Sequence, residues 1–514
     1  MATATFEKQV AQDREYVNTI QSAPAFGLRD KIGYMLGDLG GNSLQVVVNT
    51  YMLLFLVNVV GIQAAHFALI IAVCRLLDSL NDPIIGSIVD RMRGRKDGKY
   101  KRWLIWVPIP MALLTVALFM DASAWAYPVK ITYALLVYFF WGVVSSFWNI
   151  PYGTMLNSIT TNGQQRTELS NFRAIGSTGA SILVTTIAPL IVYDQMNTPQ
   201  AGGFLILTAI LGVFSVVCLF LTHRLTNERV VVSLASEPEK VNYLKVLLGF
   251  AKNRPMIAII LSYITFKFLV QTINLMNQYV FMSYYQDTRI LAAVGLGTLV
   301  PLILGMLLLK PAIKVFGKRF LTTWPLLIAG GMYLVLAFAP IPAWGWIGIQ
   351  MVCSFFQGFF TLLIWALIAD AVDYQAWLTK KRNDAIVYAT VTFVVFLVAS
   401  LSTSFIAIVV DAVGYVPALQ ANQTPEVAQA LKTTAGLLPA IGMFIVFVIF
   451  KFVSNVSEER MDEIRAEVVA MSDHLQHELE EEEQALEHGV HAATGTGEAG
   501  PAASEIDEKK EQDR

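Results

Sequence analysis

Long apolar segments, separated by short polar connections, run through most of this chain. An α-helix rises 1.5 Å per residue, so about 20 apolar residues cross the roughly 30 Å of hydrocarbon in a bilayer. The pattern therefore predicts twelve membrane-spanning helices, at residues 33–60, 64–89, 103–122, 129–153, 171–194, 203–223, 256–284, 291–313, 320–340, 343–370, 384–412 and 434–456.

Lysine and arginine are distributed unevenly among the connections. On this assignment the odd-numbered connections contain only Lys130, Arg289 and Lys432, whereas the connection at 90–102 alone contains seven basic residues. Basic residues accumulate on the cytoplasmic side of a membrane. We therefore expect a multi-pass protein of the plasma (bacterial inner) membrane with both termini in the cytoplasm.

A longer polar connection divides the predicted spans into six and six, and a similar basic turn follows the second span of each half. Two related six-helix halves are the plan of the major facilitator fold, an all-α membrane fold. The predicted parts are a cytoplasmic N-terminal segment (1–32), an N-terminal half (33–223), a cytoplasmic middle loop (224–255), a C-terminal half (256–456) and an acidic cytoplasmic tail (457–514), partly helical and then disordered.

Composition supports a membrane protein and argues against several other classes. The chain is 55% hydrophobic and 15% charged, whereas soluble domains carry about 25% charged residues. There is no basic patch with interleaved aromatic residues, so we expect no nucleic-acid partner. The apolar segments contain no nucleophile–base pair or metal motif. We therefore expect no enzyme and no cofactor.

The second apolar segment contains an unusual cluster of polar residues. Arg75, Asp78, Asn81 and Asp82 share one helix face by their spacing. Each charge at the centre of a lipid-facing helix costs roughly 2.5–3.5 kcal/mol, so the cluster is expected to face the bundle interior. Asp78 and Asp82 can hold Na⁺ or take up a proton, and Arg75 can neutralise one carboxylate when the cation is absent. A salt-bridge lock between helices is the alternative.

A second set of polar and aromatic residues suggests a sugar site. Asp38 lies among glycines in the first span, and Trp148, Asn149 and Tyr152 lie near the end of the fourth. Aromatic faces stack on the apolar face of a sugar, while amides and carboxylates pair with its hydroxyl groups. Arg173 can bind a ligand or pair with Asp38. The alternatives are an Asp38 ion pair with Arg75 or Arg173, aromatic residues of the interfacial belt, and a snorkelling arginine.

The second half adds less certain candidates. Lys267, Gln271, Thr272, Asn274, Asn277 and Gln278 follow one another along the seventh span and occupy more than one helix face. Gln357 and Thr392 are further candidates for substrate binding. Charged residues near the predicted cytoplasmic ends are expected to form a gating or charge network: Arg75, Asp90, Arg91, Asp370, Asp373 and Arg382.

These motifs resemble a known family. Arg75 to Gly86, the basic loop that ends in Gly98 to Trp103, Asn149 to Tyr152, and Ala369 to Tyr374 are similar to the glycoside–pentoside–hexuronide:cation symporters of the major facilitator superfamily, the melibiose-permease-like family, over roughly residues 30–455. The resemblance implies that a functional monomer binds sugar with Asp38 and Arg173. It also implies a cation site formed by Asp78, Asn81, Asp82 and Ser146.

The sequence departs from the melibiose permease of that family at Asn149, Gly153 and Phe396, where the permease has an aspartate, a tryptophan and a lysine. The sugar contacts are thus altered while the cation site is intact, and Na⁺ and H⁺ both stay open. We expect a secondary active transporter in which cation entry drives uptake of a glycoside or small oligosaccharide by alternating access. The alternatives are a lipid or lysolipid transporter on the same scaffold, and a membrane sensor with a regulatory acidic tail.

Overall fold

The computed structural model describes residues 18–92, 98–230, 253–270, 272–297, 299–379, 398 and 401–453, together with residues 460, 461, 463, 464, 466 and 467. The described residues are almost entirely helical, with one isolated bridge between Tyr193 and Pro199. The chain forms two units: Met1–Ile368 with Ala385–Asn455, and Ala369–Asp384 with Val456–Arg514. The all-α prediction is confirmed.

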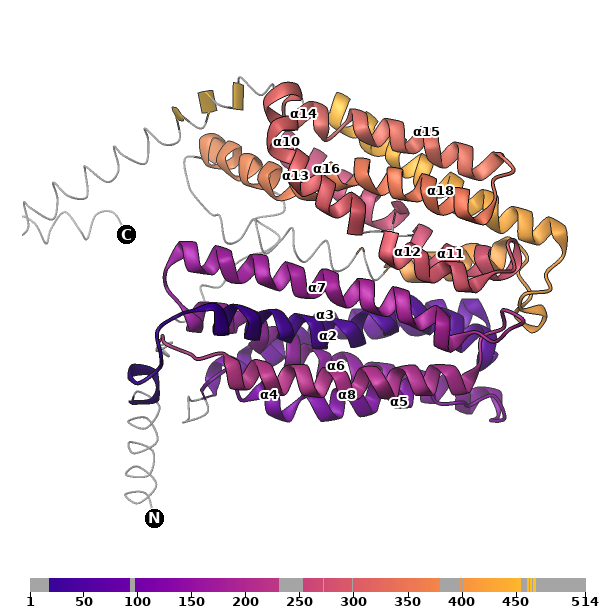
Figure 1. Cartoon of the computed structure of the whole chain (residues 1–514), viewed down its shortest axis with the longest axis horizontal. Helices are drawn as coiled ribbons and strands as arrows, with labels where there is room; N and C mark the ends of the chain where they lie inside the picture. Colours follow the sequence, from indigo (N-terminus) through magenta and orange to yellow (C-terminus); the bar gives the residue numbers. More distant parts are fainter. Residues whose placement is uncertain are drawn as a thin grey trace, which may run out of the picture. The chain divides into compact units, whose positions relative to one another are not determined.

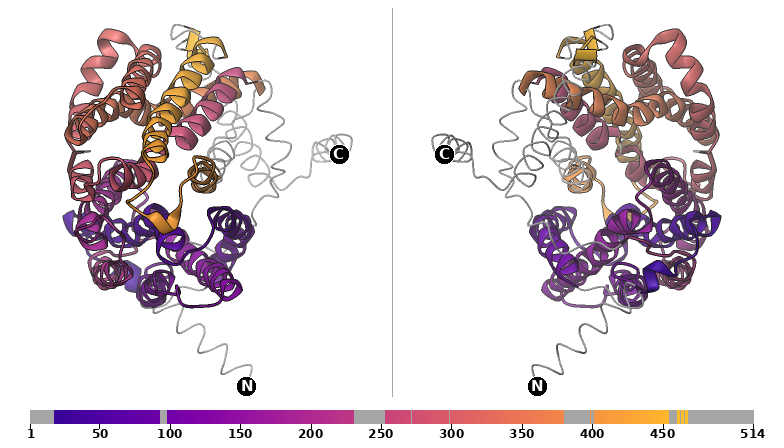
Figure 2. Two further views of the ribbon diagram at one scale, coloured as in Figure 1. Left: turned by 90° about the vertical axis from the view of Figure 1, so that its right-hand side faces the viewer. Right: turned by 90° about the vertical axis from the view of Figure 1, so that its left-hand side faces the viewer.

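The first part of the larger unit is a group of long helices that lie lengthwise beside one another (Figure 1). Helix α2 packs on α7 and α8, α3 packs on α6, and α5 packs on α6 and α8. Figure 2 shows these helices, coloured indigo to magenta, nearly end on. They are α2 (Leu28–Leu54) continued by the π-helix η1 (Phe55–Val59), α3 (Ala64–Arg91), α4 (Trp103–Trp106), α5 (Pro108–Leu118), α6 (Tyr127–Ile159), α7 (Gly163–Val192) and α8 (Ala201–Leu225).

The later helices follow a similar plan, with α18 packed on α10, α11 and α15. Figure 1 shows α15 and α18 side by side. These helices are α10 (Arg254–Thr265), the π-helix η2 (Phe266–Val270), α11 (Thr272–Ser283), η3 (Thr288–Ile290), α12 (Leu291–Gly297), α13 (Leu299–Phe316), α14 (Lys318–Leu321), α15 (Trp324–Phe338), α16 (Ala343–Thr379), η4 (Pro417–Leu419) and α18 (Pro425–Phe452).

Every predicted span range contains a described helix. Nine helical segments of the described chain are long and apolar enough to cross a membrane, and Trp103–Leu118 and Leu401–Ala412 are shorter apolar helices. Helix α3, with 28 residues, is also long enough, at 1.5 Å per residue. The count of twelve crossings and the division into two halves stay predictions.

Helix α7 begins well before the predicted start at residue 171. The Asn162 side chain accepts hydrogen bonds from the backbone N–H groups of Gln164, at 2.9 Å, and Gln165, at 3.2 Å. This cap satisfies N–H groups that would otherwise lack partners in the first turn. The polar residues before 171 therefore continue the helix beyond the apolar segment, where hydropathy gives no signal.

The seventh predicted span is interrupted. The sequence predicts one continuous helix over 256–284, but the structure has α10, the π-helix η2 and α11 in succession. The Thr272 hydroxyl donates to the carbonyl oxygen of Leu269, within η2. A π-helical turn places one additional residue in a helix and is frequent at functional sites.

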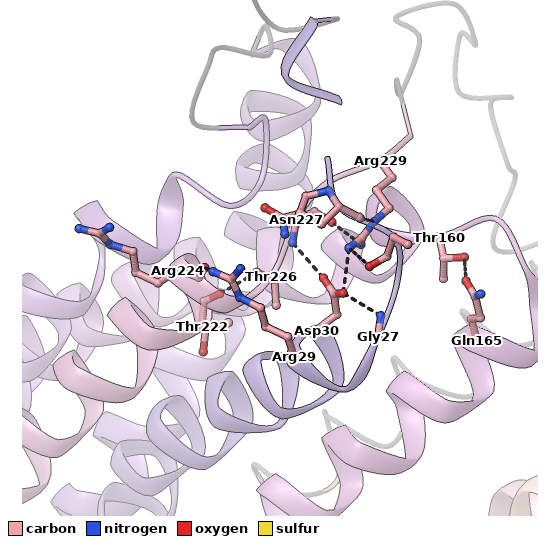
Figure 3. Close-up of polar contacts among 12 residues, drawn as sticks. Gly27, Arg29, Asp30, Thr160, Gln165, Thr222, Arg224, Thr226, Asn227 and Arg229 are labelled. Atoms are coloured by element: carbon pink, nitrogen blue, oxygen red, sulfur yellow. Dashed lines mark hydrogen bonds and ion pairs between the residues drawn. The ribbon is translucent and has the colours of Figure 1, made fainter. Parts of the chain in front are cut away.

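A polar cluster joins the start of α2 to the segment after α8 (Figure 3). Asp30 pairs with Arg229, with 2.8 Å between Oδ2 and Nη2, and accepts a hydrogen bond from the Asn227 N–H at 3.2 Å. The buried Glu228 carboxylate accepts hydrogen bonds from the backbone N–H groups of Lys99, Tyr100 and Lys101, at 2.8 to 2.9 Å. Residues 226–230, the start of the predicted middle loop, therefore pack against the first half of the chain.

The smaller unit contains the end of α16 and part of the tail. Ile464 is buried against Tyr374, Trp377 and Met461, and the Trp377 Nε1–H donates to Glu467 at 2.7 Å. The described residues 460, 461, 463, 464, 466 and 467 are helical, and the extent of the helix predicted for the tail stays a prediction. Residues 1–17, 231–252 and 468–514 lie outside the described residues, as does the predicted disorder of the tail.

Candidate functional site

A buried ion pair joins α2 and α7. Asp38 is 3% exposed, and its Oδ2 lies 3.3 Å from Nε of Arg173. The helices meet closely because Gly176 has no side chain: a Cβ there would lie 2.2 Å from the carbonyl oxygen of Met35. Asp38 Oδ1 is also buried and accepts no hydrogen bond from any described residue. One oxygen of this carboxylate is thus held by arginine, and the other has no hydrogen-bond donor among the described residues.

Aromatic rings from α2 and α6 stack beside this pair. The Tyr152 ring lies 4.7 Å from that of Tyr34 and 5.7 Å from that of Trp148, between ring centroids. The Arg173 guanidinium lies 5.2 Å from the Tyr152 ring centroid. Trp148 and Tyr152 are almost fully buried, so they pack mainly against α2. The indole N–H of Trp148 has no acceptor among the described residues.

The close fit of these rings depends on two glycines of α2. A Cβ at Gly41 would lie 1.9 Å from the Trp148 ring, and one at Gly37 would lie 2.3 Å from the Tyr152 ring. Asn149, on the same helix as these rings, is half-buried. The structure thus brings Asp38, Arg173, Trp148 and Tyr152 together and shows that the two rings belong to the packing of α2 on α6. Their role in sugar binding stays a prediction.

The polar stretch of the second span is helical throughout, within α3. Arg75 Nη1 lies 3.9 Å from Asp78 Oδ2, and Arg75 Nη2 donates to Asn49 Oδ1 of α2 at 3.0 Å. The guanidinium also lies 5.7 Å from the ring centroid of Tyr138 on α6. Asn81 is half-buried and Asp82 is exposed. Arg75 is therefore held by three helices, with Asp78 as a distant ionic partner.

Helix α6 approaches the Asp78 carboxylate at a glycine. A Cβ on Gly142 would lie 2.4 Å from Asp78 Oδ1. One turn along α6, Ser145 donates its hydroxyl hydrogen to the Gly142 carbonyl at 2.8 Å. Ser146 follows and is half-buried. The packing of α3 on α6 therefore places Asp78 beside the helix that carries Ser146, Trp148 and Tyr152.

A cavity of about 260 Å³ lies among the later helices. Gln357 of α16 lines it, and its Nε2 donates to the Tyr333 hydroxyl at 3.0 Å. Lys267, of η2, lines the same cavity. Lys267, Asn274 and Gln357 are thus the candidates from the second half that the structure places at this cavity.

For the other residues of the predicted charge network, the structure gives positions but no contact that bears on gating. Arg91 is exposed at the end of α3, and Asp370 and Asp373 lie on α16 within the smaller unit, each with interactions of its own. The Asp90 side chain and residues Arg382 and Thr392 lie outside the described residues. Their predicted roles stay predictions.

Contacts join the earlier and later helices near the C-terminal ends of α2 and α7. Gln278 Nε2 donates to the Thr50 carbonyl at 2.8 Å, and Asn58 bonds to the Tyr415 hydroxyl. Asn197 accepts from both the N–H and the hydroxyl of Thr288 at 2.8 Å. These contacts lie toward the connections that the sequence predicts to be extracytoplasmic.

Sequence reasoning missed several residues that hold the site. Asn49 and Tyr138 position Arg75, Tyr34 stacks on Tyr152, and Gly142 makes room for Asp78. Asn49 had a signal, since it is a polar residue in an apolar segment. The role of Gly142 depends on a tertiary contact and has no signature in the sequence.

Comparison with known proteins identifies the family. Residues 33–455 match the family described as MFS/sugar transport protein. The chain belongs to this family. It is a multi-pass integral membrane transporter and not an enzyme, and the predicted resemblance and major facilitator fold are confirmed.

Curated relatives cover most of the chain. It is 28% identical to the uncharacterized symporter YjmB of Bacillus subtilis (87% of this chain, 96% of the relative). It is 28% identical to the isoprimeverose transporter of Lactiplantibacillus pentosus (80% and 86%) and 25% identical to the glucuronide carrier protein homolog of Escherichia coli (86% and 95%). The crystal structure of a bacterial homolog of the lysosomal transporter Spinster matches with a TM-score of 0.59 at 14% identity (85% and 97%).

Proposed function

We propose that this family member is a cation-coupled sugar symporter of the plasma membrane, with both termini in the cytoplasm, that functions as a monomer. Entry of Na⁺ or H⁺ through Asp78 and Asp82 drives uptake of a glycoside or small oligosaccharide. This proposal rests on one observation: helix α6 contacts both charged sites. This helix meets the Asp78 carboxylate at Gly142 and carries Tyr152, which stacks beside the Asp38–Arg173 pair.

The geometry around Asp78 suits reversible binding of a cation. Charge-assisted N–H···O bonds are about 2.7–2.9 Å long, so the 3.9 Å separation from Arg75 is a weak pairing. Arg75 keeps its contacts with Asn49 and Tyr138 if Asp78 turns to another partner. Asp82, exposed one turn along α3, supplies a second carboxylate for Na⁺ or a proton.

The Asp38–Arg173 pair supports the proposed sugar site. Arg173 fixes one oxygen of Asp38, and the other oxygen is an acceptor suited to sugar hydroxyl groups. The isoprimeverose transporter and the glucuronide carrier homolog among the relatives support a glycoside as substrate. Because α6 touches both sites, cation binding at Asp78 can change the position of Trp148 and Tyr152.

The contacts at Thr50, Asn58 and Asn197 support alternating access. They join helices of the two predicted halves near the extracytoplasmic connections. Release of these contacts opens the site outward, and their formation closes it on that side. Rocking of two halves about a central site is the general plan of such transporters.

The proposal is tested by uptake of labelled glycosides into membrane vesicles, with and without an imposed Na⁺ or H⁺ gradient. We expect accumulation only with a gradient, and loss of accumulation in Asp82→Asn. The matched control is Asp121→Asn, in the connection after α5, which should behave as wild type. Gradient-independent uptake that is unchanged in Asp82→Asn would refute coupling, and transport of lysolipids without sugars would support the lipid alternative.

A further inference from the structure

Lys267 is a basic residue at membrane depth that the proposed coupling site does not use. It lies in the π-helix η2 within the seventh predicted span, with Nζ 5.7 Å from the ring centroid of Tyr263. No carboxylate of the described residues forms an ion pair with it. A cation at this depth with no carboxylate partner among the described residues is costly, and ionisable residues retained there usually mark a substrate or ion pathway.

Lys267 lines the cavity of about 260 Å³ in the later helices. Small-molecule pockets typically measure about 300–1,000 Å³, so this cavity suits one ring-sized group of a larger substrate. The described lining contains no acidic residue. The interior is therefore electropositive and polar, with room for a group that brings its own negative charge.

The amides around the cavity are fixed by one another. Gln350 and Asn277 exchange hydrogen bonds at 3.1 and 3.3 Å, and the Trp346 Nε1–H donates to Asn277 at 3.1 Å. Gln357 is fixed in the same way, by its 3.0 Å hydrogen bond to Tyr333. The wall is thus pre-organised, which reduces the entropy lost when a ligand binds.

Other polar atoms in the cavity lack partners in the described chain. Ser354 lines the cavity and forms no side-chain hydrogen bond with a described residue, and the carbonyl oxygen of the Gln357 side chain accepts none. The Lys267 ammonium and the Ser354 hydroxyl are donors that suit an anion. The carbonyl oxygen of Gln357 is an acceptor that suits a sugar hydroxyl.

We propose that this cavity is a subsite for the anionic group of an acidic glycoside, with Lys267 as the residue that selects it. The inference rests on the proposed sugar transport and narrows its substrate class. A carboxylate or sulfonate on the sugar ring pairs with the Lys267 ammonium and accepts a hydrogen bond from Ser354. A neighbouring ring hydroxyl donates to Gln357. A neutral glycoside leaves Lys267 unpaired and binds more weakly.

The test uses pairs of sugars that differ only at C6, because a uronide and its parent glycoside have the same ring and aglycone. Binding of p-nitrophenyl β-glucuronide, β-glucoside, β-galacturonide and β-galactoside to the purified full chain is measured by calorimetry. We expect wild type to bind at least one acidic member at least tenfold more tightly than its neutral partner. Lys267→Gln should remove that preference by weakening the acidic member alone.

Two further variants separate selection from a structural role. Lys267→Arg keeps the charge and should retain the preference for the acidic sugar. Lys314→Gln removes an exposed charge from α13 and should match wild type. If Lys267→Gln does not fold, loss of the preference in Lys267→Arg with folding intact would contradict the subsite.

The outcomes distinguish this inference from the proposed function. Binding of neutral sugars as tight as that of acidic ones, or an equal loss for both in Lys267→Gln, would overturn the anion subsite and leave sugar transport standing. Failure of every acidic sugar to bind wild type would overturn it as well. Absence of uptake for all glycosides, acidic or neutral, would instead refute the proposed function.

Discussion

At the scale of single residues, the proposed coupling depends on a glycine that leaves room for the Asp78 carboxylate. Asp78 has room for its carboxylate only because residue 142 is glycine: a Cβ there would lie 2.4 Å from Oδ1. The carboxylate and α6 therefore share one small space. Substitutions that fill this space are expected to act on the proposed cation site without removing any charged group.

Gly142→Ala is expected to displace the Asp78 carboxylate and lower its cation affinity by tenfold or more, measured as the cation concentration that half-saturates sugar uptake. Gly86→Ala, in α3, is the matched control because a Cβ at that position would have no neighbouring atom within 4 Å. It should retain wild-type activity, since alanine also favours the helix. Normal cation dependence in Gly142→Ala would show that Asp78 does not bind the cation in this geometry.

The Asp38–Arg173 pair gives a second prediction at this scale. Asp38→Asn leaves the half-buried Arg173 without its charged partner, so both stability and sugar affinity should fall. In Asp38→Asn/Arg173→Gln the thermal unfolding temperature should recover in part, while sugar binding stays lost. Recovery of binding together with stability would mean that the pair is only structural.

At the scale of elements, short segments outside the membrane hold long helices in place. Residues 226–230 connect the start of α2 with the turn before α4 through Asp30, Arg229 and Glu228 (Figure 3). The Glu228 carboxylate accepts three backbone hydrogen bonds and is 5% exposed. Such charge-assisted bonds fix the relative positions of α2, α4 and α8 at one end.

Glu228→Gln should destabilise the protein by about 1.5–3 kcal/mol, because hydrogen bonds to a buried charged group are replaced by weaker ones. Hydrogen exchange should rise at the amides of Lys99, Tyr100 and Lys101. The comparison is Glu426→Gln, at the exposed first turn of α18, which should change stability by less than about 0.5 kcal/mol. Equal effects of the two substitutions would contradict the role of this segment.

The helices show which parts of the fold can be predicted from the sequence alone. Hydropathy predicts where apolar helices lie, because burial in lipid requires about 20 apolar residues. It does not locate the start of α7, which the cap of Asn162 sets in a polar region, or the π-helix η2, which has no separate signal within the mixed apolar and polar pattern of the seventh predicted span. Charged residues at membrane depth, such as Asp38, Asp78 and Arg173, are visible in sequence because they are costly there. The glycines and rings that position them are not, since their roles arise from packing.

At the scale of the whole molecule, the proposed alternating access requires that the contacts predicted to lie on the extracytoplasmic side form and break. Asn197 donates to the Gln286 carbonyl at 2.5 Å and accepts from Thr288. Asp194 orders this loop by accepting hydrogen bonds from Thr198, Met196 and Gln200. Partial burial raises the pKa of Asp194, but these hydrogen bonds outweigh it and hold the pKa below its ordinary value.

A carboxyl group with a lowered pKa in the folded state stabilises that state above its unfolded pKa of about 3.9, and the effect is lost as the pH falls through the lower folded value. A fluorophore on Met196→Cys, an exposed position, should therefore report an ordered loop from pH 8 to about pH 4.5 and a change only below about pH 4. Asp194→Asn should show the disordered signal at pH 7. A transition near pH 6 would indicate that another group controls the loop.

In the proposed mechanism, cation and sugar move together through sites joined by α6. It is tested most directly by adding the transported sugar to de-energised vesicles and recording cation entry with an ion-selective or pH electrode. Wild type should show sugar-driven cation entry, whereas Asp78→Asn and Asp82→Asn should exchange labelled for unlabelled sugar without moving the cation. Sugar entry with no cation movement in wild type, or cation movement that persists in both variants, would contradict the account.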